Sequence, residues 1–320
     1  MNQYLVRPGK KVDLDDFDPD DTSLLPGGKT EAKVQLAAIV ERLAEIQELL
    51  FAGHERRLLI VLQGMDMSGK DGTIRHVMRG FNPQGTRVVS FRKPSEEELD
   101  HDFLWRVHAK VPAKGETVVF NRSHYEDVLI VRVHDLVPKA VWRKRYDQIN
   151  AFEQMLYNEG TVILKFFLHI SQDEQRRRLQ ARVDNPKKCW KFQHGDLEER
   201  KFWKDYQRAY EDALSKTSTE WAPWYIVPAN QKWYRNHLVG SISATSRTSW
   251  WSDPSKHRLS PRAEQLTKSK SNHESPKGRK PEGDGSDHQY IVNGCRSTIS
   301  IGVLFVCSCF LSGFHAFRLS

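Results

Sequence analysis

The sequence predicts an α/β fold in which a parallel β-sheet lies between two layers of helices. Five short runs rich in β-branched or aromatic residues alternate with amphipathic stretches, and continuous apolar runs of this kind are typical of strands buried on both faces. The runs are residues 58–62, 87–91, 117–120, 161–170 and 224–227. A chain of 320 residues with 38% hydrophobic residues can also build a sizeable core. In such a fold we expect ligands at the carboxyl ends of the strands.

The segment before the first run divides into an arm and a helix. Residues 1–28 are charged and interrupted by prolines and a glycine pair, which predicts an extended N-terminal arm. From Thr30 to Gly53 the apolar residues recur at helical spacing and predict an amphipathic helix of about five turns. Later helix starts carry a capping Ser or Asp with a Glu three residues on. These pairs are Ser95 with Glu98, Ser171 with Glu174, and Asp196 with Glu199.

The chain after residue 240 differs from what precedes it, so we place the main domain at residues 29–240. Residues 241–298 are rich in Ser, Lys and Arg without a periodic apolar pattern, which predicts disorder. Residues 299–317 are abruptly apolar and near the lower length of a membrane span, although Gly, Ser and His315 interrupt them. Three interpretations stay open for this segment: a membrane tail anchor, a buried strand or helix, and a non-native ending. For the main domain we expect no membrane contact.

Net charge argues against a nucleic-acid partner. The whole chain carries +8, but residues 241–320 hold 11 Lys and Arg against 6 Asp and Glu, which leaves 38 against 35 for the first 240 residues. A nearly neutral main domain lacks the electrostatic footprint of a DNA- or RNA-binding protein. The four cysteines are too few for a disulfide framework, and the N-terminus lacks the apolar core of a secretory signal. We therefore expect a cytoplasmic protein.

Residues 63–72, QGMDMSGKDG, directly follow the first apolar run and carry the spacing G-x-x-x-x-G-K. Backbone N–H groups at such a turn, entering a helix predicted over residues 73–79, bind phosphate oxygens, and the lysine supplies a mobile positive charge. The alternative is a tight turn that only packs strand on helix. The candidate phosphate-binding residues here are Gly64, Met67, Ser68, Gly69, Lys70 and Gly72.

Two aspartates make this loop unusual. Asp71 stands where a Ser or Thr hydroxyl usually binds magnesium, and Asp66 lies inside the loop. A carboxylate repels phosphate unless a cation lies between them, and hard divalent ions take oxygen ligands. We therefore expect Mg²⁺, with Mn²⁺ as an alternative, and predict that Asp66 orders the metal or orients the acceptor. Asp71 is predicted to face outward.

The third run ends in a second polar cluster. Asn121 follows the strand where nucleotide-hydrolysing proteins of this class usually carry Asp, and Arg122 comes next. Glu126, Asp127 and Arg132 lie a few positions further on, and Asp127 is a candidate second metal ligand. Two arginines near a phosphate loop suit the stabilisation of a transferring phosphoryl group. The alternative is that Arg122 and Arg132 make structural ion pairs with Glu126 and Asp127.

Residues 171–200 form a third, strongly basic element. Its cations lie on a predicted helix and on a loop after Pro186, and a basic helix joined to a basic loop suits a lid that closes over a polyanion. A solvated charged face is the alternative. The candidate polyphosphate-binding residues are Arg176, Arg178, Arg182, Lys187, Lys188 and Lys191.

Together these elements resemble the second family of polyphosphate kinases. The matching text is GMDMSGKDG (64–72), FNRSHYEDV (120–128), DNPKKCWKF (184–192) with the arginines before it, and WYIVPANQKWYRN (224–236), and the resemblance covers residues 30–238. It implies a P-loop kinase-like fold with an Arg-rich helical lid. Asp66, Lys70, Asn121 and Arg122 take its phosphate-site roles, and Arg178, Arg182 and Lys191 act from the lid. The chain departs after WYRN, where the family adds a helix and this sequence reads SISATSRTSWW.

The resemblance implies a transferase that moves the terminal phosphoryl of inorganic polyphosphate to AMP or ADP, or back from ATP, by direct in-line transfer. Glu126 occupies a position that tends to separate acceptor preferences in the family. We also expect a homo-oligomer. Two alternatives stay open: an ATP-dependent nucleotide or small-molecule kinase, and a non-catalytic P-loop binding module or membrane-tethered scaffold.

Overall fold

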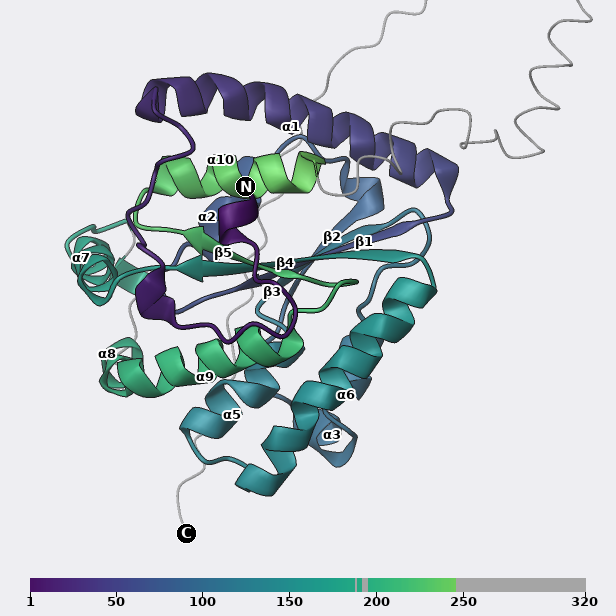
Figure 1. The fold of residues 1–320 in the computed structure, drawn as a ribbon, viewed down its shortest axis with the longest axis vertical. Helices are drawn as coiled ribbons and strands as arrows, with labels where there is room; N and C mark the ends of the chain where they lie inside the picture. The colour runs from purple at the N-terminus through teal and green to yellow at the C-terminus, as the bar shows by residue number, and fades with distance from the viewer. Residues whose placement is uncertain (188, 192–194, 246–320) are drawn as a thin grey trace, which may run out of the picture. The chain divides into compact units, whose positions relative to one another are not determined.

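The computed structural model describes residues 1–187, 189–191 and 195–245 and contains one parallel five-stranded sheet (Figure 1). The strand order is β2-β3-β1-β4-β5. The strands are β1 (Arg57–Gln63), β2 (Thr86–Ser90), β3 (Thr117–Asn121), β4 (Thr161–His169) and β5 (Trp224–Pro228). All five predicted strands are confirmed, and each end lies within one residue of its predicted position. The central strand β1 pairs with β3 on one side and β4 on the other, so the loop after β1 lies beside the loop after β3.

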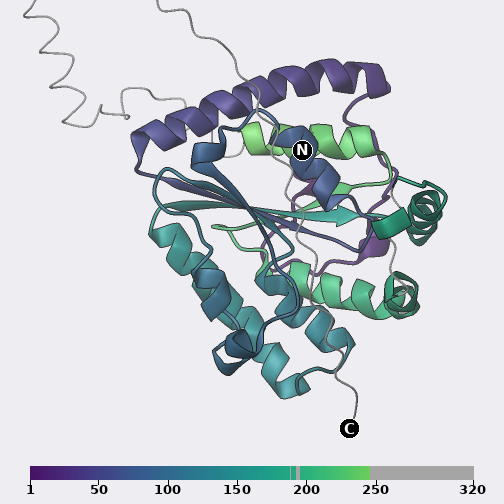
Figure 2. The same cartoon turned by 180° about the vertical axis from the view of Figure 1, so that it is seen from behind.

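Helices cover both faces of this sheet, which confirms the three-layer α/β prediction (Figures 1 and 2). One layer contains α1 (Gly28–Gly53), α2 (Lys70–Val77) and α10 (Lys232–Thr245), and the other contains α5 (Ile130–Val133), α6 (Lys139–Asn158) and α9 (Trp203–Thr217). Alternate residues of β1 enter different cores. Ile60 packs in the α1 and α10 layer, whereas Leu59 and Val61 pack in the α6 and α9 layer. This alternation explains why the run is apolar throughout.

Shorter helices fill the connections. They are α3 (Glu96–Asp100), α4 (Trp105–His108), α7 (Gln172–Val183) and α8 (Gly195–Glu199). Ser95 and Glu98 form the predicted capping box at the start of α3, and Ser171 caps α7. Because α8 begins at Gly195, Asp196 lies inside the helix and not at the predicted cap position. The described residues also include six short 3-10 helices: Asn2–Tyr4, Leu14–Asp16, Pro83–Gly85, His124–Val128, Cys189–Lys191 and Arg200–Phe202.

The N-terminal arm is folded against the domain. Val6 and Leu14 are buried, the Val6 N–H donates to Trp224 O at 2.9 Å, and Leu5 forms an isolated antiparallel bridge with Tyr225 of β5. The hydroxyl of Tyr4 lies 2.6 Å from that of Tyr234 on α10. The arm is therefore part of the core and not only an extended tail.

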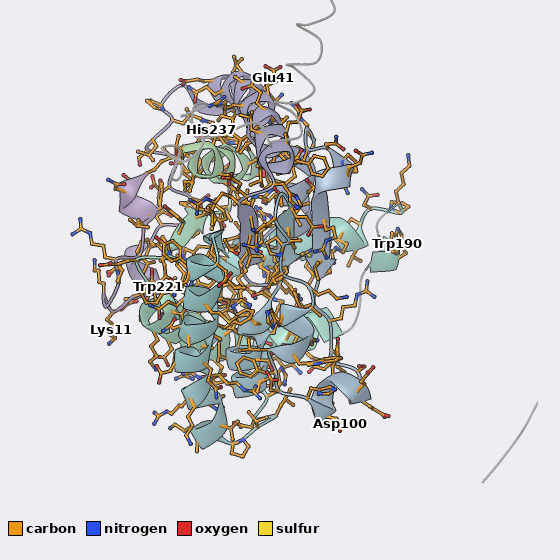
Figure 3. All side chains as sticks on the ribbon, turned by 90° about the vertical axis from the view of Figure 1, so that its right-hand side faces the viewer. Lys11, Glu41, Asp100, Trp190, Trp221 and His237 are labelled. Carbon is orange, nitrogen blue, oxygen red and sulfur yellow. The ribbon has the colours of Figure 1, made fainter. Side chains whose placement is uncertain are left out.

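The last described helix, α10, continues past the predicted domain boundary at residue 240. It runs to Thr245 and includes the sequence SISAT, so the chain continues as a helix after WYRN, and the predicted departure from the family is wrong as far as Thr245. In Figure 3 its residue His237 lies on the same side of the molecule as Glu41 of α1. The apolar run 299–317 and most of the segment 241–298 lie outside the described residues. Within the part of the chain that is described, none of the helices combines the length and apolarity that crossing a bilayer requires.

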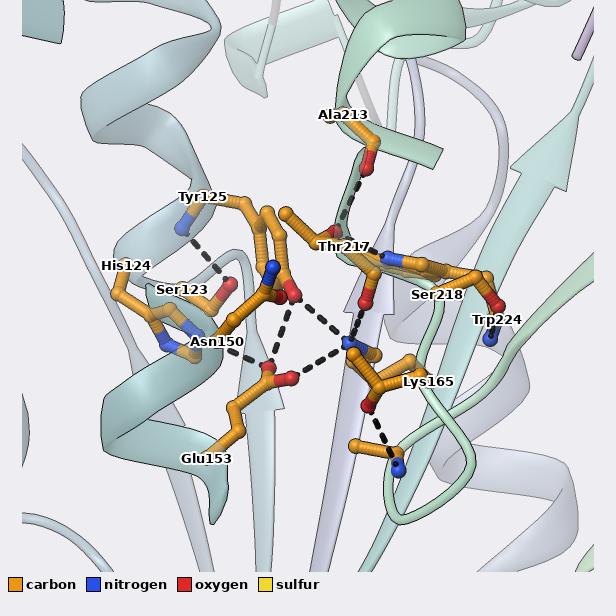
Figure 4. Close-up of polar contacts among 12 residues, drawn as sticks. Ser123, His124, Tyr125, Asn150, Glu153, Lys165, Ala213, Thr217, Ser218 and Trp224 are labelled. Carbon is orange, nitrogen blue, oxygen red and sulfur yellow. Dashed lines mark hydrogen bonds and ion pairs between the residues drawn. The ribbon is translucent and has the colours of Figure 1, made fainter. Parts of the chain in front are cut away.

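A buried ion pair links α6 to the sheet (Figure 4). The Lys165 ammonium of β4 donates to Glu153 Oε2 at 2.5 Å, to the Tyr125 hydroxyl at 2.8 Å and to Thr217 O at 2.7 Å. Both charged side chains are fully buried. Glu153 also accepts a hydrogen bond from the Tyr125 hydroxyl at 2.9 Å. These contacts satisfy a charge that a continuous apolar strand could not otherwise bury.

Candidate active site

The glycine-rich segment connects β1 directly to α2. Gly64 and Gly69 have φ values of 145° and 102°, in the region that favours glycine. A Cβ at Gly64 would lie 2.7 Å from Leu168 O, so a side chain there would collide with the backbone of β4. Lys70 is the first residue of α2, three residues earlier than the predicted helix start, and its Nζ donates to Gly64 O at 2.7 Å. The loop therefore closes around its own lysine.

The charge of Lys70 depends on pH, because the side chain is nearly buried. Its side chain is 8% exposed. Burial, followed by the nearby Arg122 guanidinium, lowers the pKa of Lys70 to about 8, and the carboxylates of Asp66, Glu126 and Asp71 oppose this effect. An added phosphate anion would favour the protonated form in the same way as these carboxylates.

Arg122 brings the loops after β1 and β3 together. Its Nη2 donates to Asp66 Oδ1 at 2.5 Å, and its Nη1 lies 3.6 Å from Glu126 Oε2. The Arg122–Glu126 pair is one of the ion pairs that the sequence suggested. Burial alone would lower the pKa of Arg122. The carboxylates of Glu126 and then Asp66 outweigh this effect and raise the pKa above its ordinary value, so the side chain stays charged.

The backbone at this junction is strained at two non-glycine residues. Met67 and Arg122 have φ values of 67° and 63°. Such left-handed conformations cost on the order of 1–3 kcal/mol each and gather at functional sites. Met67 lies in the loop after β1 and Arg122 directly after β3, and Arg122 pairs with Asp66, the neighbour of Met67. We infer that the strain orients the Arg122 side chain toward the loop.

Asn121 and Asp71 form a second link between the same two loops. Asn121 Nδ2 donates to Asp71 Oδ1 at 2.7 Å. Asp71 is exposed, as predicted, but its carboxylate is held by this amide. The residue that replaces the usual Ser or Thr therefore connects α2 to the end of β3.

Two predicted catalytic residues have partners elsewhere. Arg132 Nη1 donates to Asp212 Oδ2 at 2.6 Å, and its guanidinium lies over the Trp142 ring, so the suggested pairing with Glu126 or Asp127 is wrong for Arg132. Asp127 pairs with Arg145 at 3.1 Å and is 8% exposed. Burial raises the pKa of Asp127, against the opposing effect of Arg145. In the described part of the chain, neither side chain forms an ion pair with Arg122 or Asp66.

Arg178 on α7 supports the loop from behind. Its Nη1 donates to Met67 O at 2.8 Å and Ser68 O at 3.2 Å. Its Nη2 donates to Ala229 O at 2.6 Å and its Nε to Glu174 at 2.6 Å. The sequence predicted a phosphate ligand here, whereas the structure shows the guanidinium occupied by protein oxygens.

The other predicted lid cations differ in their exposure. Arg176 and Lys187 are exposed, and Arg182 is half-buried. Nearby, Trp190 is 74% exposed and lies at the margin of the molecule (Figure 3). Lys188 lies outside the described residues, and for Lys191 the structure describes only the backbone. The exposed cations remain available to a ligand that approaches α7 from solvent.

Three residues near the loop were not predicted from the sequence. Gln175 Nε2 donates to Asp66 O at 3.0 Å, and Arg235 Nη1 donates to Ser68 O at 3.0 Å. Tyr210 is buried and forms a hydrogen bond with the Gly64 backbone, and burial followed by Glu126 raises its pKa well above the ordinary value. Arg235 lies in the WYRN segment that matches the family, but no pattern in the sequence predicts that α9 or α10 contacts residues 64–70.

A phosphate-type loop after the central strand of a parallel sheet, with an arginine of the neighbouring strand facing it, defines a P-loop phosphotransferase. Comparison with known proteins then gives the family. The model of the family "Polyphosphate kinase 2 (PPK2)" matches residues 28–247, and the chain belongs to this family. The match covers every element described above except most of the arm.

Several relatives align over most of their length. The chain is 60% identical over 242 residues to an AMP/ADP-polyphosphate phosphotransferase of Meiothermus ruber, covering 76% of this chain and 91% of the relative. It is 48% identical over 259 residues to an ADP-polyphosphate phosphotransferase of Rhodopseudomonas palustris, covering 77% and 89%. The crystal structure of polyphosphate kinase 2 from Arthrobacter aurescens TC1 is similar with a TM-score of 0.76 and 45% identity, over 83% of this chain and 95% of that one.

Proposed function

We propose that this protein transfers the terminal phosphoryl group of inorganic polyphosphate to AMP or ADP, and that the reaction is reversible. The observation that carries the proposal is the meeting of Lys70, Arg122 and Asp66 at the carboxyl ends of β1 and β3. The names of relatives with up to 60% identity support the substrate class.

The loop and the start of α2 provide the donor site in this proposal. The Thr73 N–H makes the first bond of the helix, to Gly69 O at 2.9 Å, so the N–H groups of Lys70, Asp71 and Gly72 have no partner within α2. Such amides and the positive end of the helix dipole bind phosphate oxygens. Lys70 can leave Gly64 O and follow the phosphoryl group, and Arg122 stabilises the charge that develops on it.

The residues present fit a magnesium ion. Mg²⁺ is usually held by one or two carboxylates together with substrate phosphates, and not by an all-protein cage. Among the described residues, no group of three or more His, Cys, Asp or Glu side chains could hold a metal ion without the substrate. Asp66, whose side chain is 35% exposed, would hold the ion, which supplies charge neutralisation between phosphate oxygens. Asp127 is engaged with Arg145, so we assign it no ligand role.

We assign the rest of the polymer to the exposed cations of the α7 region. Arg176 and Lys187 are exposed, and a linear polyanion needs a track of positive side chains beyond its reacting end. Binding by several such cations should weaken steeply as salt rises, by analogy with nucleic-acid backbones.

We assign Glu126 to the acceptor side of the site. Its carboxylate lies 3.6 Å from Arg122, which places it beside the group that faces the phosphate loop. From there it can orient an incoming AMP or ADP phosphate through Arg122. A homo-oligomer and a cytoplasmic location remain predictions, and analytical ultracentrifugation and cell fractionation test them.

The test supplies inorganic polyphosphate as the sole donor, with magnesium and either AMP or ADP, and follows ADP and ATP formation. We expect turnover with at least one acceptor. An absence of turnover with both acceptors, together with ATP-driven phosphorylation of another small molecule, would overturn the proposal. Lys70→Ala is the matched variant: it should remain folded and lose most of its rate, whereas a non-catalytic binding module would show no rate to lose.

A further inference from the structure

Arg235 lies directly behind the phosphate loop. It is 2% exposed, and its Nη1 donates to Ser68 O at 3.0 Å. Its Nη2 donates to Asn236 Oδ1 at 2.8 Å. The guanidinium fills space that two glycines leave open, because a Cβ at Gly69 would lie 1.9 Å from Nη1 and a Cβ at Gly72 would lie 3.2 Å from Nη2. The glycines of the loop are thus fitted to this arginine.

The charge of Arg235 is not balanced by a carboxylate. Among the described residues it forms no salt bridge, and its hydrogen-bond partners are a backbone carbonyl and an amide oxygen. Arg178, the other arginine that donates to Ser68 O, differs because it pairs with Glu174 at 2.6 Å. Burial, followed by Arg178, lowers the pKa of Arg235 to about 9. A buried cation of this kind destabilises the ligand-free protein unless an anion is supplied.

The same arginine sets the direction of a loop amide. Ser68 O accepts from Arg178 Nη1 at 3.2 Å and from Arg235 Nη1 at 3.0 Å. In a trans peptide the C=O and the following N–H point in opposite directions. Holding Ser68 O toward the two arginines therefore turns the Gly69 N–H away from them.

We propose that Arg235 is a positioning residue for the phosphate loop, and that its buried charge is balanced by the bound phosphate chain and not by the protein. The inference rests on the proposed function for the identity of the anion. It implies that the free protein is destabilised by the buried charge of Arg235, and that binding of the anion removes this cost. Arg235 then acts through Ser68 and Gly69 and through its field, without touching the ligand.

The test separates the hydrogen bond from the charge. Arg235→Gln can still donate to Ser68 O but is neutral, whereas Arg235→Lys keeps the charge. Binding of inorganic tripolyphosphate with magnesium is measured by isothermal titration calorimetry without an acceptor, and unfolding by urea is measured with and without it. Arg42→Met is the control, since it removes an exposed positive charge from the surface of α1.

We expect Arg235→Gln to lose about tenfold or more in tripolyphosphate affinity, since the Coulomb attraction between a buried cation and an anion several ångströms away is worth at least this factor. Its stability without ligand should equal or exceed that of Arg235→Lys, and its KM for polyphosphate should rise more than its kcat falls. Arg235→Lys should bind more tightly than Arg235→Gln when both are measured near pH 6, where a buried lysine is more readily protonated, because it can carry the charge although it lacks the planar guanidinium. Arg42→Met should bind as the unchanged protein does.

Three results would overturn the inference. One is Arg235→Gln binding tripolyphosphate as tightly as the unchanged protein. Another is equal loss in the Gln and Lys variants, which would assign the effect to packing. The third is failure of Arg235→Gln to fold while Arg235→Lys folds but binds poorly. If the unchanged protein bound no tripolyphosphate, the proposed function would fall as well. If the unchanged protein turned over polyphosphate and Arg235→Gln bound tripolyphosphate as tightly as it does, only this inference would fall.

Discussion

At the scale of single residues, Lys70 is the group whose chemistry depends most on its surroundings. It is nearly buried, its Nζ donates to Gly64 O, and its pKa is lowered to about 8 by burial and then by Arg122. In the free protein Lys70 is therefore charged well below pH about 8, half-protonated near this pH and neutral well above it. Only the protonated form attracts a phosphate anion.

We predict that kcat/KM for polyphosphate falls by up to about tenfold per pH unit above pH about 8, as expected when one protonated group is required. Binding above this pH should take up protons, which calorimetry in two buffers of different ionisation enthalpy can detect. Lys187→Ala, which removes an exposed lysine, should keep the same break in the pH profile. A profile that stays flat between pH 7 and 9 would contradict the assignment to Lys70.

The residues of the loop could be predicted, and those that support it could not. Gly64, Gly69 and Lys70 follow a spacing that phosphate binding imposes within one short segment. Arg178 and Arg235 reach Ser68 from positions 110 and 167 residues away. Their contacts depend on how α7 and α10 pack, and a charged side chain on a helix gives no sign in the sequence of whether it faces solvent or a carbonyl.

At the scale of elements, α7 is held in place by its N-cap residue, Ser171, which directly precedes the helix. Ser171 Oγ accepts from the Glu174 N–H at 3.2 Å and from Asn230 Nδ2 at 3.1 Å. The helix that begins there carries Arg178 to the back of the loop. The strand ends were predicted within one residue because buried parallel strands are bounded by polar residues. The C-terminal end of α10 was not predicted, because the residues SISAT carry no strong helix signal.

We predict that Ser171→Ala lowers the free energy of unfolding by about 1 kcal/mol, the usual cost of removing an N-cap hydroxyl, measured by urea denaturation. It should also raise KM for polyphosphate, because α7 holds the loop through Arg178. Ser95→Ala is the matched control, since Ser95 Oγ accepts from the Glu98 N–H at 3.2 Å at the start of α3. The control should lose stability without a change in KM. Equal KM effects in the two variants would contradict the link from α7 to the loop.

At the scale of the whole molecule, the Lys165–Glu153 pair joins the α6 and α9 layer to the sheet. Burial alone would raise the pKa of Glu153. The Lys165 ammonium outweighs this effect and lowers the pKa, so the carboxylate stays charged inside the core. Removing one partner leaves the other charge buried and uncompensated, which is far more costly than removing both.

We predict that Lys165→Met lowers the free energy of unfolding by about 3–5 kcal/mol, and that adding Glu153→Gln recovers part of this loss. Lys216→Met is the control on α9, where the lysine is 45% exposed and pairs with Asp212, and it should cost less than about 1 kcal/mol. Urea denaturation of the four proteins measures these differences. A double variant that is less stable than Lys165→Met alone would refute the account of this pair.

The docked arm also sets an order of events during synthesis. Ser218 Oγ donates to Val6 O at 2.6 Å, across a separation of 212 positions. Ribosomes add about 5–20 residues per second, so the first residues to emerge wait on the order of tens of seconds for the surface that receives them. Docking of the arm should therefore be a late step, and chains arrested before residue 218 should leave residues 1–27 open to proteolysis that the finished protein resists.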